Sequence, residues 1–544
     1  MKKYIKPTLA AMIAAVTLTA CEDLDVENKS QYVTADQKEA VLNINPGMGV
    51  AGLAGISATV NQYQSVYANH FDFGYASVML GTDLQGVDMV SSWSGYNWFS
   101  DWEGFTSPTA NGTPSGEMWY TIFKQIFACN AVCTTIPADT ESKSAMFQRA
   151  QAVMTRAWDY WILANYYQFN YEGHENALCV PIVTDENAKE VEEKGAPRAT
   201  VQEVYDQILK DATEAISLIE ASGMNPDDMI ASKPKRFGSL ATAYGVRARA
   251  YLTMHKYDLA ADDAQKAIEN FAGQGAPLSI SEAARPGFWS LDSKNWMWGI
   301  PVNESDRVVT SGIVNFPSHI CTFSGNSYAS VGAFRCINVA LYENIPVSDS
   351  RKGWWLDENN QSANLTAAEQ RYIDNLDVVP DPYCNVKFAG YQDVPGTTTN
   401  ANDIPLMRIE EMYYIVAEGL AMSGKVSEGV AFLNDFVKNY RDPKYNCTAT
   451  TPEDAQEAVY QQRRIEFWGE GLSYIDLMRL DKEIDRWGCN WPTQATFRIP
   501  SSTGDPAKAG VRIYCIPQGE INGNPAITES QNNPTCSAPN GTWK

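Results

Sequence analysis

Three stretches in the C-terminal part of the chain decide the fold: Asp403-Ile-Pro-Leu-Met-Arg408-Ile-Glu410-Glu411, Arg463-Arg464-Ile-Glu466-Phe-Trp-Gly-Glu470-Gly471 and Ile516-Pro517-Gln-Gly-Glu520-Ile-Asn-Gly-Asn524-Pro525. The charged residues of the first two stand on or beside expected helices, among apolar neighbours at helical spacing. Buried charges in such positions usually pair with each other. We therefore expect the following residues to build the scaffold and not to bind a ligand: Arg408, Glu410, Glu418, Arg464, Glu466 and Glu470.

In this order and spacing the three stretches resemble the RagB/SusD family, the surface glycan-capturing lipoproteins of Bacteroidetes. The resemblance implies a mainly α-helical fold, in which tetratricopeptide-like helix pairs form a scaffold and long irregular, aromatic-rich insertions form a ligand face. It also implies a protein that binds oligosaccharide or polysaccharide at the cell surface and delivers it to a TonB-dependent transporter of the SusC type. One position departs from the family: Ser473 stands two residues after Gly471, where an Arg is frequent.

The N-terminus has the pattern of a bacterial lipoprotein signal. Lys2, Lys3 and Lys6 precede a short apolar run, and Leu18-Thr-Ala-Cys21 reads as a lipobox. The run is too short to span a bilayer, which requires about 20 residues. We expect residues 1–20 to be a signal peptide, Cys21 to carry lipid and residues 21–40 to be a tether. The acidic run that follows Cys21 resembles the signal that sends Bacteroidetes lipoproteins to the outer face of the outer membrane.

The mature chain is strongly acidic. Signal removal deletes three lysines and no carboxylates, which leaves 39 basic against 65 acidic residues and a net charge of −26. Nucleic acids and anionic lipid head groups both require a basic surface. The composition therefore argues against nucleic-acid binding, and it leaves the lipid as the membrane attachment.

Residues 41–544 show no Pro-, Gly- or Ser-rich linker, so we expect one domain. Two segments, at about 143–270 and 403–480, carry helix-pair patterns with small residues where two antiparallel helices would cross. The positions are Ala248, Tyr251, Ala260, Ala264 and Ala267 in the first, and Ala417, Leu420, Gly429, Leu433 and Phe436 in the second. Ordinary helix hairpins with alanine at the crossing are the alternative. Insertions are expected at about 60–120 and 275–400.

The first insertion contains a dense aromatic cluster, Trp93-Ser-Gly-Tyr96-Asn97-Trp98-Phe99-Ser-Asp101-Trp102. Sugars present C–H faces that pack on rings and hydroxyls that need amide or carboxylate partners. Each Trp and Tyr has an apolar body and a polar handle, so the same cluster also suits a core or any wet interface. From the resemblance we expect Trp93, Tyr96, Asn97 and Trp98 to bind the ligand, and Asp83 with them.

The second insertion adds further rings. Asn295-Trp-Met-Trp298 reads as a strand in which Trp296 and Trp298 share one face, and a core role is expected for at least one of them. Tyr328 lies in loop-like sequence, Ser324-Gly-Asn-Ser-Tyr328, which favours a ligand contact. We expect Tyr328 and Trp296 to complete the binding face.

Enzymatic motifs are missing from the sequence. The four histidines show no HExxH or paired metal-ligand spacing, and there is neither a Gly-x-Ser-x-Gly elbow nor a phosphate-binding glycine loop. We therefore expect a binding protein without catalytic residues, metal site or cofactor, although the sequence leaves a loop-ordering calcium ion open. A peptide-binding uptake lipoprotein of the same architecture is the first alternative. A glycoside hydrolase is the second, because it requires only two suitably spaced carboxylates.

Ten cysteines follow Cys21, and they are scattered over the chain. Cys129 and Cys133 are one helical turn apart without a nearby His or further Cys to complete a zinc site. Buried free thiols are the favoured interpretation, and an exported protein also permits a few disulfides.

Overall fold

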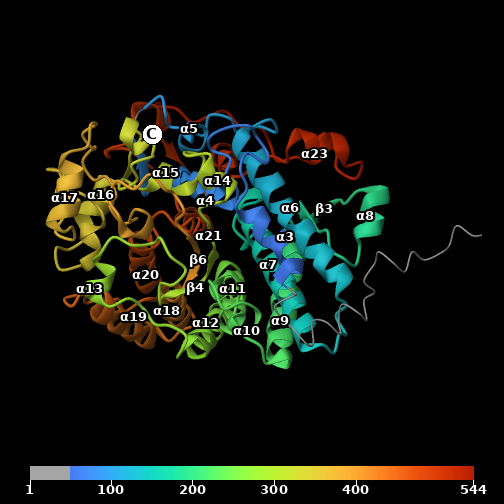
Figure 1. Cartoon of the computed structure of the whole chain (residues 1–544). Helices are drawn as coiled ribbons and strands as arrows, with labels where there is room; N and C mark the ends of the chain where they lie inside the picture. The colour runs from blue at the N-terminus through green and yellow to red at the C-terminus, as the bar shows by residue number, and fades with distance from the viewer. Residues whose placement is uncertain (1–49, 93) are drawn as a thin grey trace, which may run out of the picture.

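The computed structural model describes residues 50–544 except residue 93, and it is mainly α-helical, as the sequence predicts (Figure 1). The predicted signal peptide and tether, Cys21 and Trp93 lie outside the described residues. The longer helices are α3 (Val50–Val60), α4 (Tyr75–Gln85), α6 (Thr113–Thr135), α7 (Lys143–Tyr167), α9 (Val201–Ser222), α11 (Leu240–Thr253), α12 (Tyr257–Phe271), α18 (Ile409–Met422), α19 (Val426–Tyr440) and α20 (Pro452–Glu466). The shorter ones are α5 (Ser100–Gly104), α8 (Ala188–Lys194), α10 (Pro226–Met229), α13 (Ile280–Ala283), α14 (Arg307–Thr310), α15 (Phe316–Ile320), α16 (Val339–Asn344), α17 (Ala367–Asp374), α21 (Ser473–Arg479), α22 (Pro506–Ala509) and α23 (Gln518–Gly523).

The helices pair along the chain, and small residues stand where two of them cross. A Cβ atom built on Gly429 of α19 would lie 2.5 Å from the carbonyl oxygen of Ala417 and 2.7 Å from the amide nitrogen of Ala421, both in α18. Real Cβ atoms do not approach backbone so closely, so only glycine permits this crossing. Gly419 of α18 contacts α12 in the same way: a Cβ atom built on it would lie 2.5 Å from the carbonyl oxygen of Tyr257. The small residues expected at the helix crossing of the second segment are therefore present.

Short strands connect segments that are distant in sequence. The described residues contain four two-stranded antiparallel pairs: β1 (Met89–Ser91) with β5 (Arg335–Ile337), β2 (Leu178–Pro181) with β3 (Arg198–Thr200), β4 (Trp296–Ile300) with β6 (Ile404–Arg408), and β7 (Ile484–Asp485) with β8 (Arg498–Ile499). β1 belongs to the first insertion and β5 to the second. The two insertions therefore share a sheet, and what one presents to solvent depends on the other.

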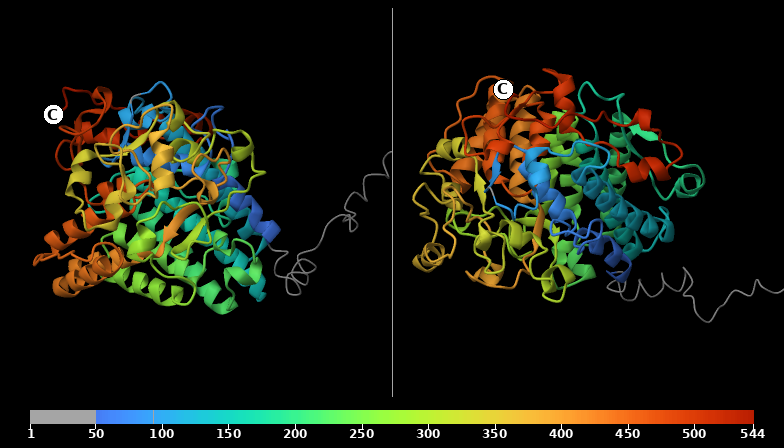
Figure 2. Two further views of the ribbon diagram at one scale, coloured as in Figure 1. Left: turned by 60° about the vertical axis from the view of Figure 1, so that its left-hand side comes forward. Right: turned by 90° about the horizontal axis from the view of Figure 1, so that it is seen from above.

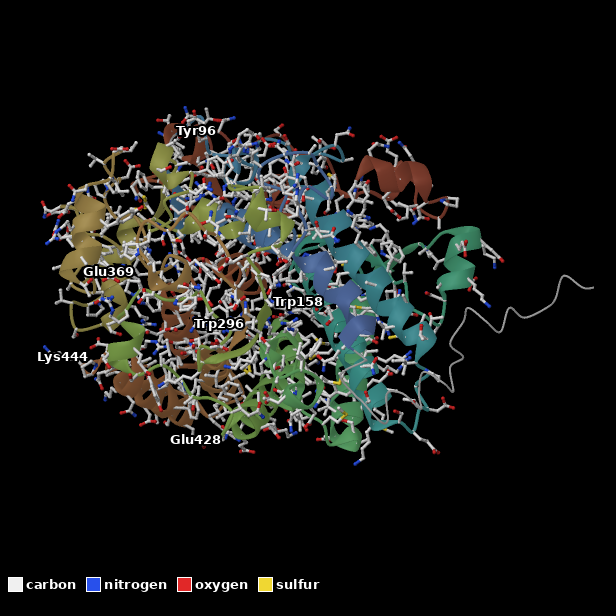
Figure 3. All side chains as sticks on the ribbon, in the orientation of Figure 1. Tyr96, Trp158, Trp296, Glu369, Glu428 and Lys444 are labelled. Carbon is white, nitrogen blue, oxygen red and sulfur yellow. The ribbon has the colours of Figure 1, made fainter. Side chains whose placement is uncertain are left out.

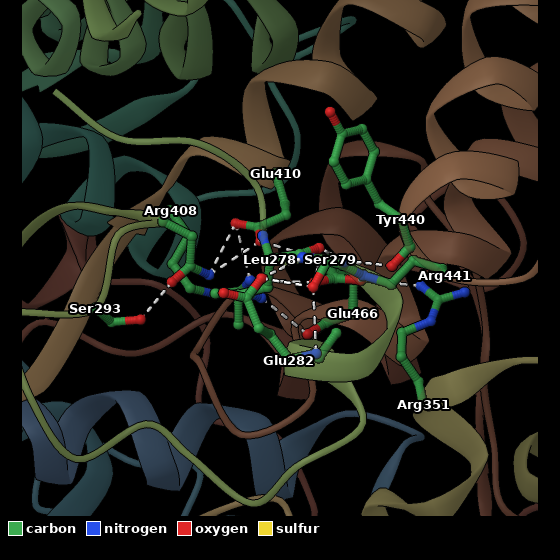
Figure 4. A network of polar contacts seen from close by, with 12 residues as sticks. Leu278, Ser279, Glu282, Ser293, Arg351, Arg408, Glu410, Tyr440, Arg441 and Glu466 are labelled. Carbon is green, nitrogen blue, oxygen red and sulfur yellow. Dashed lines mark hydrogen bonds and ion pairs between the residues drawn. The ribbon is translucent and has the colours of Figure 1, made fainter. Parts of the chain in front are cut away.

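A buried ion network holds the C-terminal scaffold together (Figure 4). The carboxylate of Glu466, at the end of α20, lies 3.1 Å from Arg408, 2.7 Å from Arg441 and 3.1 Å from Arg351. Glu410 bridges Arg408 and Arg441 at 3.1 and 3.0 Å. The expectation that these charges pair with each other is confirmed.

Other charged residues of this part of the chain pair with residues outside the network. Arg464 binds Asp88 at 2.6 Å, and the hydroxyl of Ser473 donates to the same carboxylate at 2.5 Å. At the position where an Arg is frequent in the family, the smaller Ser473 thus still contacts an acidic partner. Glu418 pairs with Arg479 of α21 at 2.6 Å.

The third quoted stretch packs beside the first insertion. The amide of Gln518 at the start of α23 donates to the carbonyl of Ala110 at 2.9 Å, and Arg486 donates to the carbonyl of Gly86 at 2.8 Å. In both views of Figure 2 the C-terminal red segments lie next to the blue N-terminal ones. The first insertion is therefore supported from the C-terminal end of the chain.

Candidate functional site

The candidate site is the loop of residues 92–99, which runs from β1 to α5 above the β1–β5 pair. Glu103 of α5 fixes this loop at both ends. One carboxylate oxygen accepts from the amide of Ser91 at 2.9 Å, and the other accepts from the Asn97 side chain at 2.7 Å. Burial raises the pKa of Glu103 above its usual value. These bonds tie Ser91 at the end of β1 and Asn97 between the two rings to the same buried carboxyl.

Two rings of the loop reach the surface. Tyr96 is 49% exposed, and Figure 3 shows it at the upper edge of the molecule. Trp98 is half-buried, and its indole packs on the imidazole of His70 with ring centroids 4.5 Å apart. These two rings have the partial exposure that a ligand face requires.

The rings beneath Trp98 continue inward. His70 Nδ1 is in hydrogen-bond contact with the hydroxyl of Tyr328, which stacks on His319 at 4.5 Å. His319 in turn stacks on Phe73 at 5.3 Å. Burial raises the pKa of Tyr328 and lowers that of His319, so both rings are neutral. Trp98 thus rests on a stack of rings that continues into the core.

Four expected ligand residues are buried, and this corrects the expectation of an exposed face. Trp296 is 1% exposed and lies in β4 opposite Arg408, while Tyr328 is 4% exposed within the ring stack. Asn97 is 7% exposed because its amide is bound to Glu103. Asp83 is 1% exposed, and its carboxylate accepts from the amide of Gly471 at 3.1 Å.

These side chains support the site without facing solvent. Burial raises the pKa of Asp83 to about 8, so its carboxyl is largely neutral at pH 7. Figure 3 places Trp296 well inside the outline of the molecule, in agreement with its burial. Of the residues expected from the sequence, Tyr96 and Trp98 remain as candidates for direct contact, and Trp93 lies outside the described residues.

His70 is the residue that the sequence analysis missed. It lies within the first insertion, in Tyr67-Ala-Asn69-His70-Phe71, which is also rich in rings. Asp72 organises this segment by accepting from the amides of Val66 and Tyr67 at 2.7 and 2.6 Å. The density of rings in residues 67–71 is a sequence signal for a ring cluster. Helical or strand periodicity, however, does not predict that this segment folds back against Trp98.

The carboxylates of this region are engaged in holding the chain. Asp72 binds two backbone amides, Glu103 binds Ser91 and Asn97, and Asp101 accepts from the hydroxyl of Thr106. In the part of the chain that the structure describes, no group of three or more His, Cys, Asp or Glu side chains is arranged to hold a metal ion. The local chemistry is that of ring faces and hydrogen-bonding groups.

A separate cavity of about 430 Å³ lies where α6, α8 and α23 meet. Its walls are mainly apolar and aromatic, with charged groups among them: Trp119, Tyr120, Phe123, Lys124, Phe127, Pro181, Val183, Val191, Glu192, Gly195, Ala196, Glu520, Gly523, Asn524 and Pro525. Phe127 is 56% exposed at its rim. This cavity is another surface on which a ligand could rest, and it provides a comparison for the loop.

Comparison with known families identifies two matching regions. Residues 24–252 match a family model described as starch-binding and associating with the outer membrane, and residues 328–535 match the model of the SusD family. A comparison with curated proteins finds no match.

Solved structures show the same fold at low sequence identity. A SusD-like carbohydrate-binding protein from Bacteroides vulgatus superposes with a TM-score of 0.69 and 22% identity, covering 90% of this chain and 98% of its own. Surface glycan-binding protein A from Bacteroides thetaiotaomicron, in complex with laminarihexaose, gives a TM-score of 0.63 and 16% identity over 89% and 98%. A laminarin-binding SusD-like protein gives a TM-score of 0.63 and 18% identity over 90% and 99%.

Proposed function

The chain belongs to the SusD/RagB family, and from this premise we propose that it captures oligosaccharide or polysaccharide at the cell surface and delivers it to a TonB-dependent transporter of the SusC type. In this proposal Cys21 carries the lipid that anchors the protein to the outer membrane. Among the described residues no helix is both long and apolar enough to cross a membrane. Family membership supports the outer-membrane location and the carbohydrate ligand.

The observation that carries the proposal is the pair of rings on loop 92–99. Tyr96 stands in solvent, and Trp98 is held from below by His70. A sugar ring packs its C–H face on such a surface, and the exposed phenol of Tyr96 also offers a polar group to its hydroxyls. Because Glu103 already holds Asn97 between the two rings, Asn97 has little conformational freedom to lose on binding, which favours affinity.

The proposal includes no bond cleavage. A glycosidase requires two carboxyl groups that flank the scissile bond, one as acid and one as nucleophile or base. Asp72, Asp101 and Glu103 each already bind a neighbouring part of the chain: Asp72 the amide of Tyr67, Asp101 the hydroxyl of Thr106, and Glu103 the amide of Ser91. Prolonged incubation with a bound glycan should therefore generate no new reducing ends.

The test is calorimetry of the lipid-free protein against a panel of glycans and peptides. The panel includes laminarihexaose and starch oligosaccharides, since solved relatives and the matched family model point to such ligands. We expect saturable binding to one glycan class, with affinity that rises with chain length as further contacts engage. Saturation by peptides alone would overturn the glycan proposal in favour of peptide uptake.

Two variants assign the site. Tyr96→Ala removes an exposed ring, and we expect it to weaken binding about tenfold, which corresponds to about 1.4 kcal/mol. Phe127→Ala removes a ring of similar exposure at the cavity between α6, α8 and α23, and it should leave binding unchanged. The opposite result would move the glycan site to that cavity.

The transporter partner needs its own experiment. Isolation of the lipidated protein from outer membranes under mild detergent should co-purify a β-barrel transporter of the SusC type. Cys21→Ser should release the protein from the membrane fraction. Continued membrane attachment of that variant would contradict the lipid anchor.

A further inference from the structure

Two cysteines face each other across adjacent antiparallel segments of the second insertion. Cys336 is the central residue of β5, and Cys384 is its partner in an isolated antiparallel bridge. The amide of Ile337 donates to the carbonyl of Tyr383 at 3.0 Å, and the amide of Asn385 donates to the carbonyl of Arg335 at 2.9 Å. The hydrogen bonds thus flank the cysteines, which makes them a non-hydrogen-bonded pair.

This position has the geometry that a disulfide needs. In a non-hydrogen-bonded pair the Cα atoms are about 4.5 Å apart, and the two side chains point to the same face and approach closely. Disulfides join residues whose Cα atoms are about 4.4–6.8 Å apart. A hydrogen bond to Cys384 and burial together raise the pKa of Cys336 well above its usual value, in agreement with the pairing of the two residues across the strands.

The compartment also favours oxidation. The family is associated with the outer membrane, which a protein reaches through the periplasm, and disulfides form and persist there. Both thiols are buried, at 2% and 0% exposure, so once formed the bond would be shielded from reductants. In the structure both sulfurs are thiols.

We propose that Cys336 and Cys384 are joined by a disulfide in the exported protein, a covalent site that lies beyond the glycan-binding function proposed above. Each thiol loses its proton, one S–S bond forms, and the electron pair reduces the disulfide of a periplasmic thiol oxidase to a dithiol. Burial requires that the exchange takes place during folding, before the second insertion closes over the pair.

The bond would fasten the floor of the candidate site. Cys336 pairs with Val90 of β1 on one side and with Cys384 on the other. Ser92, at the start of the ring-bearing loop, donates its amide to the carbonyl of Phe334 at 3.1 Å. A crosslink at Cys336 would therefore tie together β1, β5 and the segment around Cys384, from which the loop rises.

A third thiol makes the pairing testable. Burial raises the pKa of Cys321, the neighbouring Cys384 adds a smaller contribution, and the sulfur of Cys321 donates to the carbonyl of Phe388 at 3.2 Å. Thr322 separates it from the pair, with its hydroxyl 3.2 Å from the sulfur of Cys384. The cross-strand geometry selects Cys336 as the partner of Cys384 and leaves Cys321 reduced.

The experiment is differential alkylation of the full-length lipoprotein. Cells are quenched in acid, the protein is denatured, and free thiols are blocked with N-ethylmaleimide; after reduction the released thiols receive iodoacetamide, and peptides are mapped by mass spectrometry. We expect iodoacetamide on Cys336 and Cys384 and N-ethylmaleimide on Cys321. Cys179, which is equally buried, is the internal control for the first label.

Variants check the assignment. In Cys336→Ala, Cys384 should change completely from the second label to the first, whereas in Cys179→Ala the labels of the pair should stay as in the wild type. Without reductant, a crosslinked peptide pair should also appear in the wild type, lighter than the sum of its parts by the mass of two hydrogen atoms. First-label modification of both cysteines in the wild type, or a crosslink between Cys321 and Cys384, would overturn the proposal.

Discussion

Glu466→Gln is the sharpest test of how the scaffold is held together. Glu466 is fully buried, and three guanidinium groups converge on it: those of Arg351, Arg408 and Arg441. The complete network joins four cations to four anions, and the pairs are Arg351–Asp349, Arg351–Glu466, Lys387–Glu470, Arg408–Glu410, Arg408–Glu466, Arg408–Glu470, Arg441–Glu410 and Arg441–Glu466. Neutralising one carboxylate leaves one positive charge without compensation in the interior.

The structure gives the expected magnitude. Removing one partner of a buried ion pair costs about 3–5 kcal/mol, because the charge left behind remains desolvated. The matched control is Glu457→Gln, the same substitution on the same helix α20. Glu457 pairs with Lys482 at 2.6 Å, but the two side chains are 47% and 33% exposed. An exposed ion pair contributes about 0–1 kcal/mol, so the control should change the free energy of unfolding very little.

Acid provides an independent signature of the same charge. The guanidinium groups of Arg441, Arg408 and Arg351 hold the pKa of Glu466 well below its usual value, against the effect of burial. A carboxyl with a lowered folded-state pKa contributes stability above its unfolded-state pKa, and this contribution is lost as the pH falls through the folded-state value. The wild type should therefore lose stability in acid more steeply than Glu466→Gln does.

The assay is urea unfolding followed by tryptophan fluorescence, with glycan binding measured in buffer. We expect Glu466→Gln to lower the unfolding free energy by several times the loss in Glu457→Gln, while the glycan dissociation constant stays unchanged wherever the variant is folded. Equal stabilities of the two variants would refute the view that the network carries the scaffold. A selective loss of glycan binding with normal stability would mean that these charges act in recognition.

Three further outcomes follow from the structure. Asp83→Asn should flatten the pH dependence of stability up to about pH 8. Burial raises the pKa of Asp83 to about 8, and such a group contributes stability that is lost as the pH rises through that value. Unfolding midpoints across the pH range measure this effect. Gly429→Ala should destabilise the protein by about 1–3 kcal/mol through overpacking of the α18–α19 crossing. Gly55→Ala, a substitution with open space around it on α3, should stabilise the protein slightly. Equal effects of the two variants would contradict the close crossing. Trp98→Ala should weaken glycan binding and also lower stability by about 1–2 kcal/mol, less than the loss of a fully buried ring would cost, because Trp98 is only half-buried against His70. Calorimetry measures the first effect and thermal unfolding the second. An unchanged glycan affinity would exclude this ring from the site.

The scaffold could be predicted from the sequence because its signals are local. Small residues at the spacing of a helix pair, such as Gly429, favour a close helix crossing. Charges among apolar neighbours, such as Glu466, must find partners because an unpaired buried charge is too costly. Each of these inferences needs only a helix and the physics of burial, so each could be made without knowing the tertiary arrangement.

The ligand face could be predicted only in part because the relevant contacts are not local. Tyr328 was expected to face solvent since its surrounding sequence is loop-like, yet it stacks on His319 and contacts His70 from the other insertion. Trp296 is buried because β4 pairs with β6, a strand more than a hundred residues away. Irregular segments of this length need an apolar core of their own, and their rings supply it.

Within the same cluster of rings, the buried side chains support the loop and the exposed ones are available to a ligand. Tyr96 and Trp98 are adjacent in sequence to Asn97 and Phe99, whose side chains are buried, so exposure alternates along residues 96–99 of the loop. The inward groups fix the loop through Glu103, which determines where the outward rings stand. A ligand that matches their spacing meets a surface already in place, and one that does not match would have to break the Asn97–Glu103 contact to gain a fit. Selectivity by shape is therefore expected to weaken in Asn97→Ala, a variant that touches no ligand, and this loss should appear as a smaller ratio between the affinities for the preferred and the next-best glycan.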